Sequence, residues 1–480
     1  MLVLDRQSGV PLYEQIYTYI KSNIESGNFT AGTRLPSVRA LAGEIGVSKI
    51  TVEQAYVQLA AEGYLKAHDR APYEVLDIPV LTDSVQPVLE TDHSNLIHSG
   101  RTEAKQTGSG ANRPVQQSEP AVRYNFATGA MDPEGFDYSR WKRYIGYVLR
   151  NPERLMAYGD PQGELELRQA LQGYLSAARG VTARSEFTLI GSGTQSMAIA
   201  IASILKRAGL TTIGVEVEAL SGIKTIFEDF GFTVVEIAQR GDDLFDILDK
   251  MKVEAVYCTP SHCDRSGSVM TAARRKELLQ WAAKPGRYII EDDYDSELRY
   301  YGRPISSLQG MNGADCVIYV GTPSKVLPPS IRLSYMVLPP VLWDAFVRYR
   351  RSYRQSASVM EQLVWARFIA AGEWSKQIRR LRKHYSDKSK YMVMNLEREF
   401  GSGITVKAPE GGVYISLIVH TKATAAELAV LAKEGGCDVR RGVDRPGEGV
   451  QCLLSFSAIP TKQLEKAIKQ LGKAWKGIIL

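Results

Sequence analysis

The sequence predicts an α/β protein in two unequal parts: a small helical domain, then a larger domain with a mostly parallel sheet and a smaller C-terminal α+β subdomain. Residues 10–76 carry three helical patterns in succession, and residues 78–122 are rich in Ser, Thr, Gln, Pro and Gly. From residue 123 onward, helical patterns alternate with short apolar runs, as in a parallel sheet covered on both faces. We therefore predict domains at 1–77 and 123–480, joined by a linker at 78–122.

The composition is that of an ordinary folded protein. Of its 480 residues, 44% are hydrophobic and 23% charged, which argues against a disordered chain, collagen or a coiled-coil rod. No signal peptide is recognisable and no stretch offers about 18 uninterrupted apolar residues, so we expect a cytoplasmic protein without a membrane span. The five cysteines lack a CxxC pair, which predicts reduced, mostly buried thiols and no metal site. A net charge of +6 is compatible with a nucleic-acid partner but too mild to identify one.

The first helical pattern repeats apolar residues at a spacing of four: Leu12, Ile16, Ile20 and Ile24. Gly27 ends it. A short helix follows, for which we predict Pro36 in the first turn and Gly46 at the end. Ser48 is the predicted N-cap of a third helix. That helix carries three apolar residues on one face: Val52, Tyr56 and Leu59.

The order helix, short helix, turn, helix is that of a helix-turn-helix, whose second helix enters the DNA major groove with its N-terminal residues. The string LPSVRALAGEIGVSKITVEQAYVQLAAEGYL, residues 35–65, resembles GntR-type winged helices, and the resemblance covers about residues 10–76. It implies a set of residues that face double-stranded DNA: Arg39, Ser48, Lys49 and Thr51, with Arg34 near the backbone. Small hydroxyls and a cation at a helix start suit phosphate contacts.

The predicted wing departs from the GntR pattern. It has HDRAPYEV in place of a Gly-rich turn, so Arg70 is the obvious candidate for a minor-groove contact. Acids and bases are about balanced in residues 1–76, so any electrostatic footprint must be local. The alternative is an ordinary helical module that docks on the second domain.

Apolar runs rich in Val, Ile and Tyr predict the strands of the larger domain. They are FTLIGSG, TTIGVEVE, AVYCTP, RYIIEDDYD, CVIYVGT and RLSYMVLP. Closer to the C-terminus, GGVYISLIV and QCLLSFSAI flank helices and predict the smaller subdomain.

The string GTPSKVLPPSIRLSYMV, residues 321–337, holds residues suited to covalent chemistry. A lysine that forms a Schiff base with an aldehyde needs hydroxyls and a cation nearby to hold the cofactor phosphate. Thr322, Ser324 and Arg332 stand around Lys325 at suitable spacing.

Two other segments supply the remaining parts of a cofactor site. RYIIEDDYD ends a buried strand with Asp292 and Tyr294. A buried carboxylate keeps a pyridine nitrogen protonated, and a phenol hydroxyl can bond the ring O3′. We interpret the neighbouring Asp293 as structural. In LIGSGTQ, a strand turns into a helix whose free N–H groups would bind phosphate: those of Gly193, Thr194 and Gln195.

The order of these segments, with TPSHCDRSG between them, resembles fold-type I aminotransferases over about residues 123–480. The fused arrangement resembles the MocR/GabR subfamily of GntR-type regulators, including its PdxR-like members. The resemblance implies pyridoxal 5′-phosphate on Lys325, a seven-stranded sheet and a domain-swapped homodimer. In that dimer Tyr158 would reach a phosphate of the other protomer, a packed tyrosine being the alternative. His262 would lie over the ring, a core histidine being the alternative, and Asp264 stands where aminotransferases hold an asparagine.

The same resemblance indicates that the amino-acid site is incomplete. Transamination requires a group that holds the substrate carboxylate, usually a bidentate arginine. By hand alignment, this chain has Ala458 at that position, and Leu220 and Gly222 where GABA-responsive relatives have an aromatic residue and another arginine. Efficient turnover of free amino acids is therefore not expected.

Three functional hypotheses follow. The favoured one is a regulator whose small-molecule effector is pyridoxal phosphate itself and which controls the biosynthesis of this cofactor. Within the same class, an amino acid, amine or dipeptide could be sensed through an external aldimine, read by Arg440 or Arg441. The others are an active aminotransferase with an accessory DNA-binding domain and a binding module with a vestigial lysine.

Between Arg348 and Lys390 the chain has twelve Lys or Arg against three Asp or Glu. A solvated helix face is the favoured interpretation. A second DNA-contacting surface that includes Arg379, Arg380 and Arg382 is the alternative.

Overall fold

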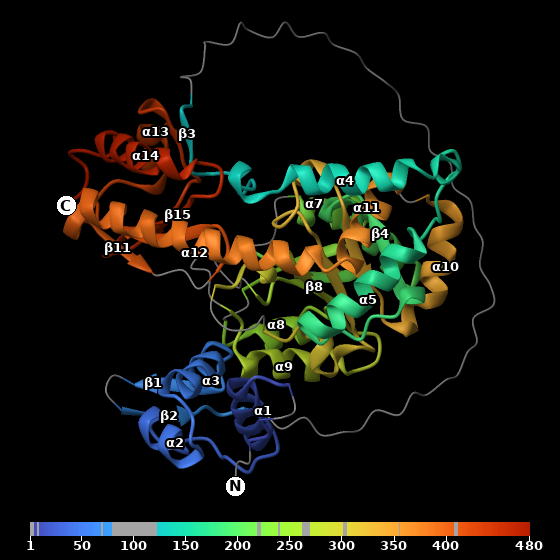
Figure 1. Cartoon of the computed structure of the whole chain (residues 1–480), viewed down its shortest axis with the longest axis horizontal. Coiled ribbons are helices and arrows are strands. Elements are labelled where there is room, and N and C mark those ends of the chain that lie inside the picture. The colour runs from blue at the N-terminus through green and yellow to red at the C-terminus, as the bar shows by residue number, and fades with distance from the viewer. Residues whose placement is uncertain are drawn as a thin grey trace, which may run out of the picture.

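The computed structural model describes residues 4–6, 9–68, 71–78, 122–217, 222–238, 241–261, 269–300, 305–354, 356–407 and 411–480. Figure 1 shows a small N-terminal body beside a larger body built around a sheet. None of the helices in these ranges combines the length and apolar character that a membrane span needs. The four cysteines in these ranges are free thiols, and three of them are buried.

The N-terminal body contains three helices and a hairpin: α1 (Leu12–Glu25), α2 (Val38–Ile45), α3 (Lys49–Ala61), β1 (Leu65–His68) and β2 (Ala71–Val75). Six of the predicted apolar positions form its core: Ile16, Ile20, Ile24, Val52, Tyr56 and Leu59 are each at most 5% exposed, whereas Leu12 is only half-buried. The antiparallel pairing of β1 and β2 adds the two strands of a wing.

The predicted start of α2 is wrong by two residues. Ser37, not Pro36, borders the helix, because its Oγ accepts a hydrogen bond from the N–H of Ala40 at 3.1 Å. A serine hydroxyl satisfies one of the open N–H groups of a first turn, which proline cannot do. The predicted end at Gly46, with φ of 65°, and the predicted N-cap Ser48 are both confirmed.

The central sheet has seven strands in the order β4-β10-β9-β8-β7-β5-β6. Their bounds are β4 (Thr188–Gly191), β5 (Thr212–Glu216), β6 (Thr233–Ile237), β7 (Ala255–Cys258), β8 (Tyr288–Asp293), β9 (Val317–Gly321) and β10 (Ser334–Val337). Only β10 runs antiparallel to its neighbours, so the predicted mostly parallel sheet is confirmed. The edge strand β6 was not predicted, because it is only partly buried and Glu236 interrupts its short apolar run.

Helices cover both faces of the sheet (Figure 1). Their bounds are α4 (Tyr138–Leu149), α5 (Leu165–Arg179), α6 (Thr194–Arg207), α7 (Ile223–Asp229), α8 (Leu244–Lys250), α9 (Ala272–Ala282), α10 (Trp343–Ser352), α11 (Val359–Ala370) and α12 (Glu373–Phe400). The helices α6, α7 and α10 share one apolar core with the sheet. On the other face, α8 and α9 form a second core, and α5, α11 and α12 belong to a third.

The C-terminal subdomain is α+β, as predicted. Its sheet has the order β11-β12-β15-β14, and a separate parallel pair joins β13 to β3. The bounds are β3 (Tyr124–Asn125), β11 (Ile404–Lys407), β12 (Tyr414–Val419), α13 (Ala425–Glu434), β13 (Cys437–Asp438), β14 (Val443–Arg445), β15 (Gly449–Ser455) and α14 (Thr461–Ala474). The long helix α12 runs between this subdomain and the large sheet (Figure 1).

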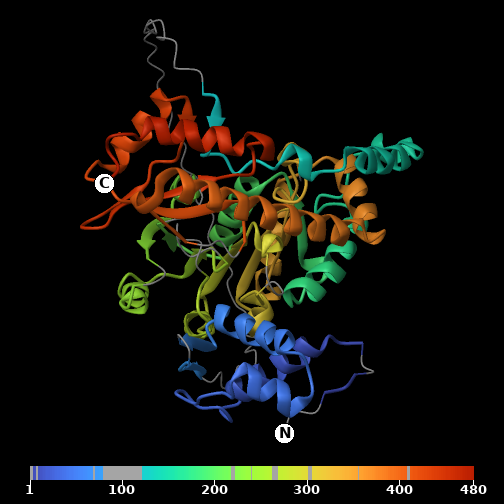
Figure 2. The ribbon, with the colours of Figure 1, turned by 60° about the vertical axis from the view of Figure 1, so that its left-hand side comes forward.

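The N-terminal body packs against the start of α9, as both views show (Figure 1, Figure 2). The N–H of Ala272 donates a hydrogen bond to the carbonyl oxygen of Glu62 at 2.9 Å, and Ala272 is part of the N-terminal apolar core. Gly63, with φ of +76°, lets the chain turn close to Thr271, where a Cβ would lie 3.1 Å from the threonine Cβ. The two bodies are therefore joined by a small, tightly fitted contact.

Candidate functional site

The surface predicted to meet DNA lies at the turn between α2 and α3. The Oγ of Ser48 accepts a hydrogen bond from the Thr51 N–H at 3.2 Å and lies 2.8 Å from the Thr51 hydroxyl. Lys49 is exposed in the first turn of α3, and Ile50 is 66% exposed. An apolar side chain at this helix end suits contact with a base edge. Ile50 was not among the predicted DNA-binding residues, because isoleucine in a helical pattern normally indicates a core position.

The remaining predicted DNA-binding residues lie close to this helix in the chain. Arg39 on α2 and Arg34 before it are both exposed. Arg34 forms an isolated antiparallel bridge with Glu74 of β2, which places it beside the wing. Arg70 lies outside the described residues.

The arginines of α12 are partly bound to their own domain. The Nε of Arg382 donates a hydrogen bond to the carbonyl oxygen of Glu297 at 2.6 Å, and Arg382 is half-buried. Arg380 lies 3.7 Å from the carboxylate of Asp137, whereas Arg379 is exposed. These contacts favour the interpretation of a solvated helix face over a second DNA surface.

Lys325 lies in the turn that follows β9. Its Nζ donates a hydrogen bond to the carbonyl oxygen of Gly129 at 2.8 Å. Burial lowers the pKa of the Lys325 ammonium, Asp295 acts in the opposite direction, and Arg440 lowers the pKa further. An amine that loses its proton more readily is a better nucleophile toward an aldehyde.

Asp292 lies near the carboxyl end of β8 and is 1% exposed. The hydroxyl of Tyr257 on β7 donates a hydrogen bond to its Oδ2 at 2.6 Å. Its buried Oδ1 has no hydrogen-bond partner within the described ranges. Burial raises the pKa of Asp292 to about 7. A buried acceptor without a donor is the complement of a protonated ring nitrogen.

The glycine turn after β4 lies directly against Arg332. A Cβ on Gly193 would collide with the guanidinium of Arg332, and the φ of Gly193 is +108°. Arg332 itself has φ of +54°, a rare conformation for a residue with a side chain, and its Nη2 donates to the carbonyl oxygen of Ser192 at 3.2 Å. Strained residues of this kind gather at ligand sites.

The prediction of three free N–H groups in this turn is wrong for Gly193. Its N–H donates a hydrogen bond to the Oγ of Ser334 at 2.9 Å, because β10 pairs with β4 at this point. Thr194 and Gln195 occupy the first turn of α6, where N–H groups have no acceptor inside the helix. The side chain of Gln195 reaches Gly222, where a Cβ would lie 3.5 Å from its Nε2.

Two hydroxyls near Lys325 hold the loop that carries it. The Thr322 hydroxyl donates to the carbonyl oxygen of Leu333 at 3.0 Å and lies 2.8 Å from the Ser324 hydroxyl. Since the Thr322 proton points to Leu333, the Ser324 hydroxyl donates to Thr322. Their direct contact with a cofactor phosphate stays a prediction.

Asp293 is part of a buried brace, as its structural interpretation required. Its Oδ2 accepts from the Nε of Arg179 at 2.7 Å and from the hydroxyl of Tyr319 at 2.5 Å. Arg179 also reaches the hydroxyl of Ser261, at 3.2 Å. The brace fixes the end of β8, and with it the position of Asp292.

Tyr414 and Arg440 form a wall of the site beside Lys325 that was not part of the predicted cofactor site. A Cβ on Gly129 would collide with both the Tyr414 hydroxyl and the Lys325 amine, so these groups meet at Gly129. The Nε of Arg440 donates to the carbonyl oxygen of Ala127 at 3.1 Å. Its guanidinium carbon lies 5.4 Å from the centre of the Tyr414 ring.

Four residues predicted near the cofactor remain: Tyr158, Tyr294, His262 and Asp264. Tyr158, in the loop before α5, is 97% exposed, so the alternative of a packed tyrosine is wrong for the single chain. Tyr294 follows β8 and is partly buried, and burial raises the pKa of its phenol. His262 and Asp264 lie outside the described residues, so the contacts predicted for them stay predictions.

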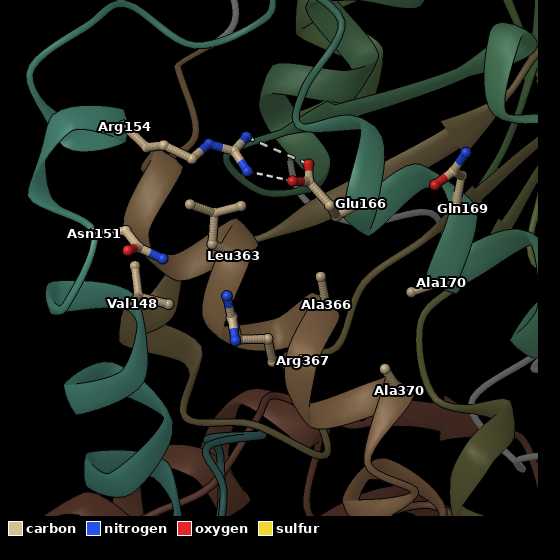
Figure 3. A pocket seen from close by; sticks show the side chains of 10 residues that line it. All are labelled: Val148, Asn151, Arg154, Glu166, Gln169, Ala170, Leu363, Ala366, Arg367 and Ala370. Carbon is tan, nitrogen blue, oxygen red and sulfur yellow. Dashed lines mark hydrogen bonds and ion pairs between the residues drawn. The ribbon is translucent and has the colours of Figure 1, made fainter.

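A separate cavity of about 450 Å³ lies among α4, α5 and α11 (Figure 3). Its floor is apolar and includes Val148 and Leu363, while Arg154 and Glu166 form an ion pair across it. None of the residues that line it belongs to the strand ends near Lys325. It is therefore not the candidate cofactor site.

The strand-end residues fit pyridoxal 5′-phosphate. When bound, this cofactor supplies an aldehyde that captures amines and a ring that withdraws electrons. Lys325 is suited to hold the aldehyde, Asp292 the ring nitrogen through its unpaired Oδ1, and Arg332 the phosphate beside the first turn of α6. The unpaired, buried oxygen of Asp292 is the observation on which this fit depends.

Fold and site together define a class of protein, a winged-helix DNA-binding domain fused to an aminotransferase-like domain. Residues 12–75 match the family described as bacterial regulatory proteins, gntR family, and residues 128–471 match aminotransferase class I and II. The chain belongs to the MocR/GabR subfamily of GntR-type transcription regulators.

Curated relatives match this chain over three quarters of its length or more. The HTH-type transcriptional regulator YhdI of Bacillus subtilis (strain 168) is 33% identical over 99% of this chain and 98% of its own. The probable rhizopine catabolism regulatory protein MocR of Rhizobium meliloti is 29% identical over 99% of this chain and 96% of its own length. The pyridoxine biosynthesis transcriptional regulator PdxR of Corynebacterium glutamicum is 27% identical over 77% of this chain and 76% of its own length.

Among solved structures, the kynurenine aminotransferase of Pyrococcus horikoshii has a TM-score of 0.64 at 23% identity. The structural match covers 75% of this chain and 91% of the aminotransferase chain. This likeness confirms the predicted fold-type I architecture of the larger domain.

Proposed function

We propose that this chain is a cytoplasmic, pyridoxal 5′-phosphate-dependent transcription regulator that senses the cofactor itself and controls its biosynthesis. The unpaired Oδ1 of Asp292 is the observation that carries this proposal. Keeping a buried carboxyl oxygen without a donor is unfavourable, and a protonated pyridine nitrogen removes that cost. The name of the relative PdxR, pyridoxine biosynthesis transcriptional regulator, supports the same effector.

A chain of contacts supports communication between the cofactor site and the DNA-binding body. Arg275 on α9 is 1% exposed, and its guanidinium donates to the carbonyl oxygens of Pro260 at 3.0 Å and Ser306 at 2.8 Å. Pro260 lies two residues beyond β7, at the strand ends that hold the cofactor site. The same helix begins at Ala272, which bonds to Glu62 beyond α3. A shift of the loop at Pro260 would therefore be passed to α3.

The alanine at 458, which by hand alignment stands where aminotransferases have the carboxylate-binding arginine, supports a sensor over an enzyme. An alanine cannot hold a substrate carboxylate in the way an arginine does. An active aminotransferase is the competing function. Steady production of a keto acid from a common amino acid, abolished by Lys325→Ala, would establish it against this proposal.

A domain-swapped homodimer completes the proposal. Tyr158 is 97% exposed and Met156, in the same loop, 83%. Two large exposed side chains in one loop indicate an interface, and we infer that a second copy of the chain covers them. Within that dimer, Tyr158 would bind the cofactor phosphate of the other protomer.

The decisive experiment is a DNA-binding titration on the intergenic region that flanks the gene, with and without pyridoxal phosphate. We expect the cofactor to change the DNA affinity of the full chain, and Asp292→Asn to need a higher cofactor concentration for the same change. Asp229→Asn, a substitution of an exposed aspartate on α7, is the control and should respond like the wild type. If pyridoxal phosphate leaves the DNA affinity unchanged and an amine changes it, the effector is an amine and the proposal of cofactor sensing is wrong.

A further inference from the structure

The cavity among α4, α5 and α11 is separate from the strand ends near Lys325 and has the features of a binding site of its own. Its volume of about 450 Å³ lies within the range of small-molecule pockets. Three buried apolar side chains contribute to its floor: Val148, Leu363 and Ala366. Such a floor favours contact with the apolar body of a ligand over contact with water.

The acidic side chain at this cavity is already bound. The guanidinium of Arg154 donates to both carboxylate oxygens of Glu166 and, at 2.6 Å, to the Oε2 of Glu164. The bonds from Arg154 hold the pKa of Glu166 below its usual value, so this carboxylate stays ionised and paired. Glu166 is the one acid among the described residues that line the cavity. No unbound carboxylate is therefore left for a cationic amine.

Arg367 on α11 is the base at this cavity that no acid holds. Within the described part of the chain, its guanidinium forms neither an ion pair nor a hydrogen bond. Figure 3 shows the guanidinium extending from α11 into the cavity, toward Leu363 and Val148. The lining residues include two bases, Arg154 and Arg367, and one acid, which leaves a net charge of +1. The cavity therefore combines an apolar floor with an unsatisfied cation.

We propose that this cavity binds an apolar monoanion without an amino group, such as a medium-chain carboxylate, with its acid group on Arg367. The planar guanidinium matches both oxygens of a carboxylate, and the apolar body of the ligand would lie on the floor at Leu363 and Val148. The amide side chains of Asn151 and Gln169 also line the cavity and can donate to the same anion. The inference goes beyond the proposed function, because this ligand is neither the cofactor nor an amine that reacts with it.

The cavity lies at the base of the loop that carries Met156 and Tyr158. Arg154 precedes these two residues in the chain and Glu166 follows them, so their ion pair joins the two ends of the loop. A ligand in contact with both α4 and α5 would brace this base. Its occupancy would therefore act on the loop from outside the cofactor site.

The test is isothermal titration calorimetry of the full chain with octanoate and with octan-1-ol, which have the same apolar body and differ in the acid. Neither probe carries an amine, so neither reacts with an aldehyde at Lys325. We expect one octanoate per chain, bound about tenfold or more tightly than octanol. Arg367→Gln should reduce the affinity for octanoate to that for octanol. Arg379→Gln, at an exposed position of α12, is the matched control and should bind octanoate like the wild type.

A second variant, Ala170→Trp, tests the cavity without a change of charge. Ala170 is half-buried on α5 and lines the cavity, so an indole there should fill the space and abolish binding of both probes. Urea unfolding shows whether this variant is folded; if it is not, Arg367→Gln decides alone.

Three outcomes overturn the inference. The first is a wild type that binds neither probe, or both with equal affinity. The second is a preference for octanoate that survives in Arg367→Gln, because the acid would then be held elsewhere. The third is unchanged octanoate binding by folded Ala170→Trp, because the ligand would then lie outside this cavity.

Discussion

The buried carboxyl group of Asp292 ties the stability of the cofactor-free protein to pH. Burial raises its pKa from 3.8 to about 7. In the unfolded chain the group titrates near pH 4, so between about pH 4 and 7 the unfolded chain loses a proton that the folded chain keeps. Stability therefore falls as the pH rises through this range. The difference between the two pKa values corresponds to about 4 kcal/mol, all of it lost above about pH 7.

Asp292→Asn removes this titration and keeps the shape of the side chain. We expect the cofactor-free variant to be more stable than the wild type at pH 8, by up to about 4 kcal/mol, and the difference to shrink toward pH 4. Urea unfolding at several pH values, followed by tryptophan fluorescence, measures this difference. Asp229→Asn at an exposed position should leave the pH dependence of the wild type unchanged.

Bound cofactor should reverse which of the two proteins is the more stable. A protonated ring nitrogen at Oδ1 favours the charged carboxylate, so the loaded wild type should be more stable than loaded Asp292→Asn at pH 8. Stability curves that run parallel from pH 5 to 8 in the two cofactor-free proteins would refute the reasoning, because the carboxyl would then titrate as it does in water.

Three further predictions concern other parts of the chain. Lys388→Met removes one of the two side chains bonded to the fully buried carboxylate of Asp132, leaving His384 at 2.7 Å, and should cost about 3 kcal/mol in urea unfolding; an unchanged midpoint would contradict the pairing. Lys49→Ala should weaken binding to all DNA sequences alike and reduce the slope of log affinity against log salt by about 1, whereas loss at one base position only would exclude a phosphate contact. Gly63→Val forces a side chain against Thr271 at φ of +76°, so calorimetry should show the N-terminal body unfolding in a separate, earlier transition; a wild-type trace would mean that the contact is not tight.

The elements that the sequence predicted well are those with local causes. Ile16, Ile20 and Ile24 recur on one helix face and are buried, and Ser48 caps α3, because period and capping are properties of neighbouring residues. The same holds for β8, the strand that carries Asp292, whose apolar run is continuous and buried on both faces. The start of α2 was misplaced because Pro36 and Ser37 both suit a helix start, and only the observed hydrogen bond decides between them.

The parts that sequence reasoning missed depend on contacts between distant segments. Ala127 and Arg440 are 313 residues apart, so no local pattern indicates that one holds the other. The N–H of Gly193 was expected to be free because a glycine turn before a helix normally offers its donors to a ligand. Ser334 takes that donor only because β10 enters the sheet beside β4.

The two charges at the site have opposite sign and separate tasks. Asp292 lies near the carboxyl end of β8, fully buried, and its unpaired oxygen is complementary to a cationic ring nitrogen. Arg440 lies in the exposed wall from the C-terminal subdomain, and its open donors are complementary to an anion. Since a buried charge depends more strongly on its partner than an exposed one, loss of the cofactor should perturb the sheet ends around Asp292 more than the surroundings of Arg440. Pro260 and Arg275 lead from those sheet ends to the DNA-binding body, so cofactor occupancy should be the signal that this path carries.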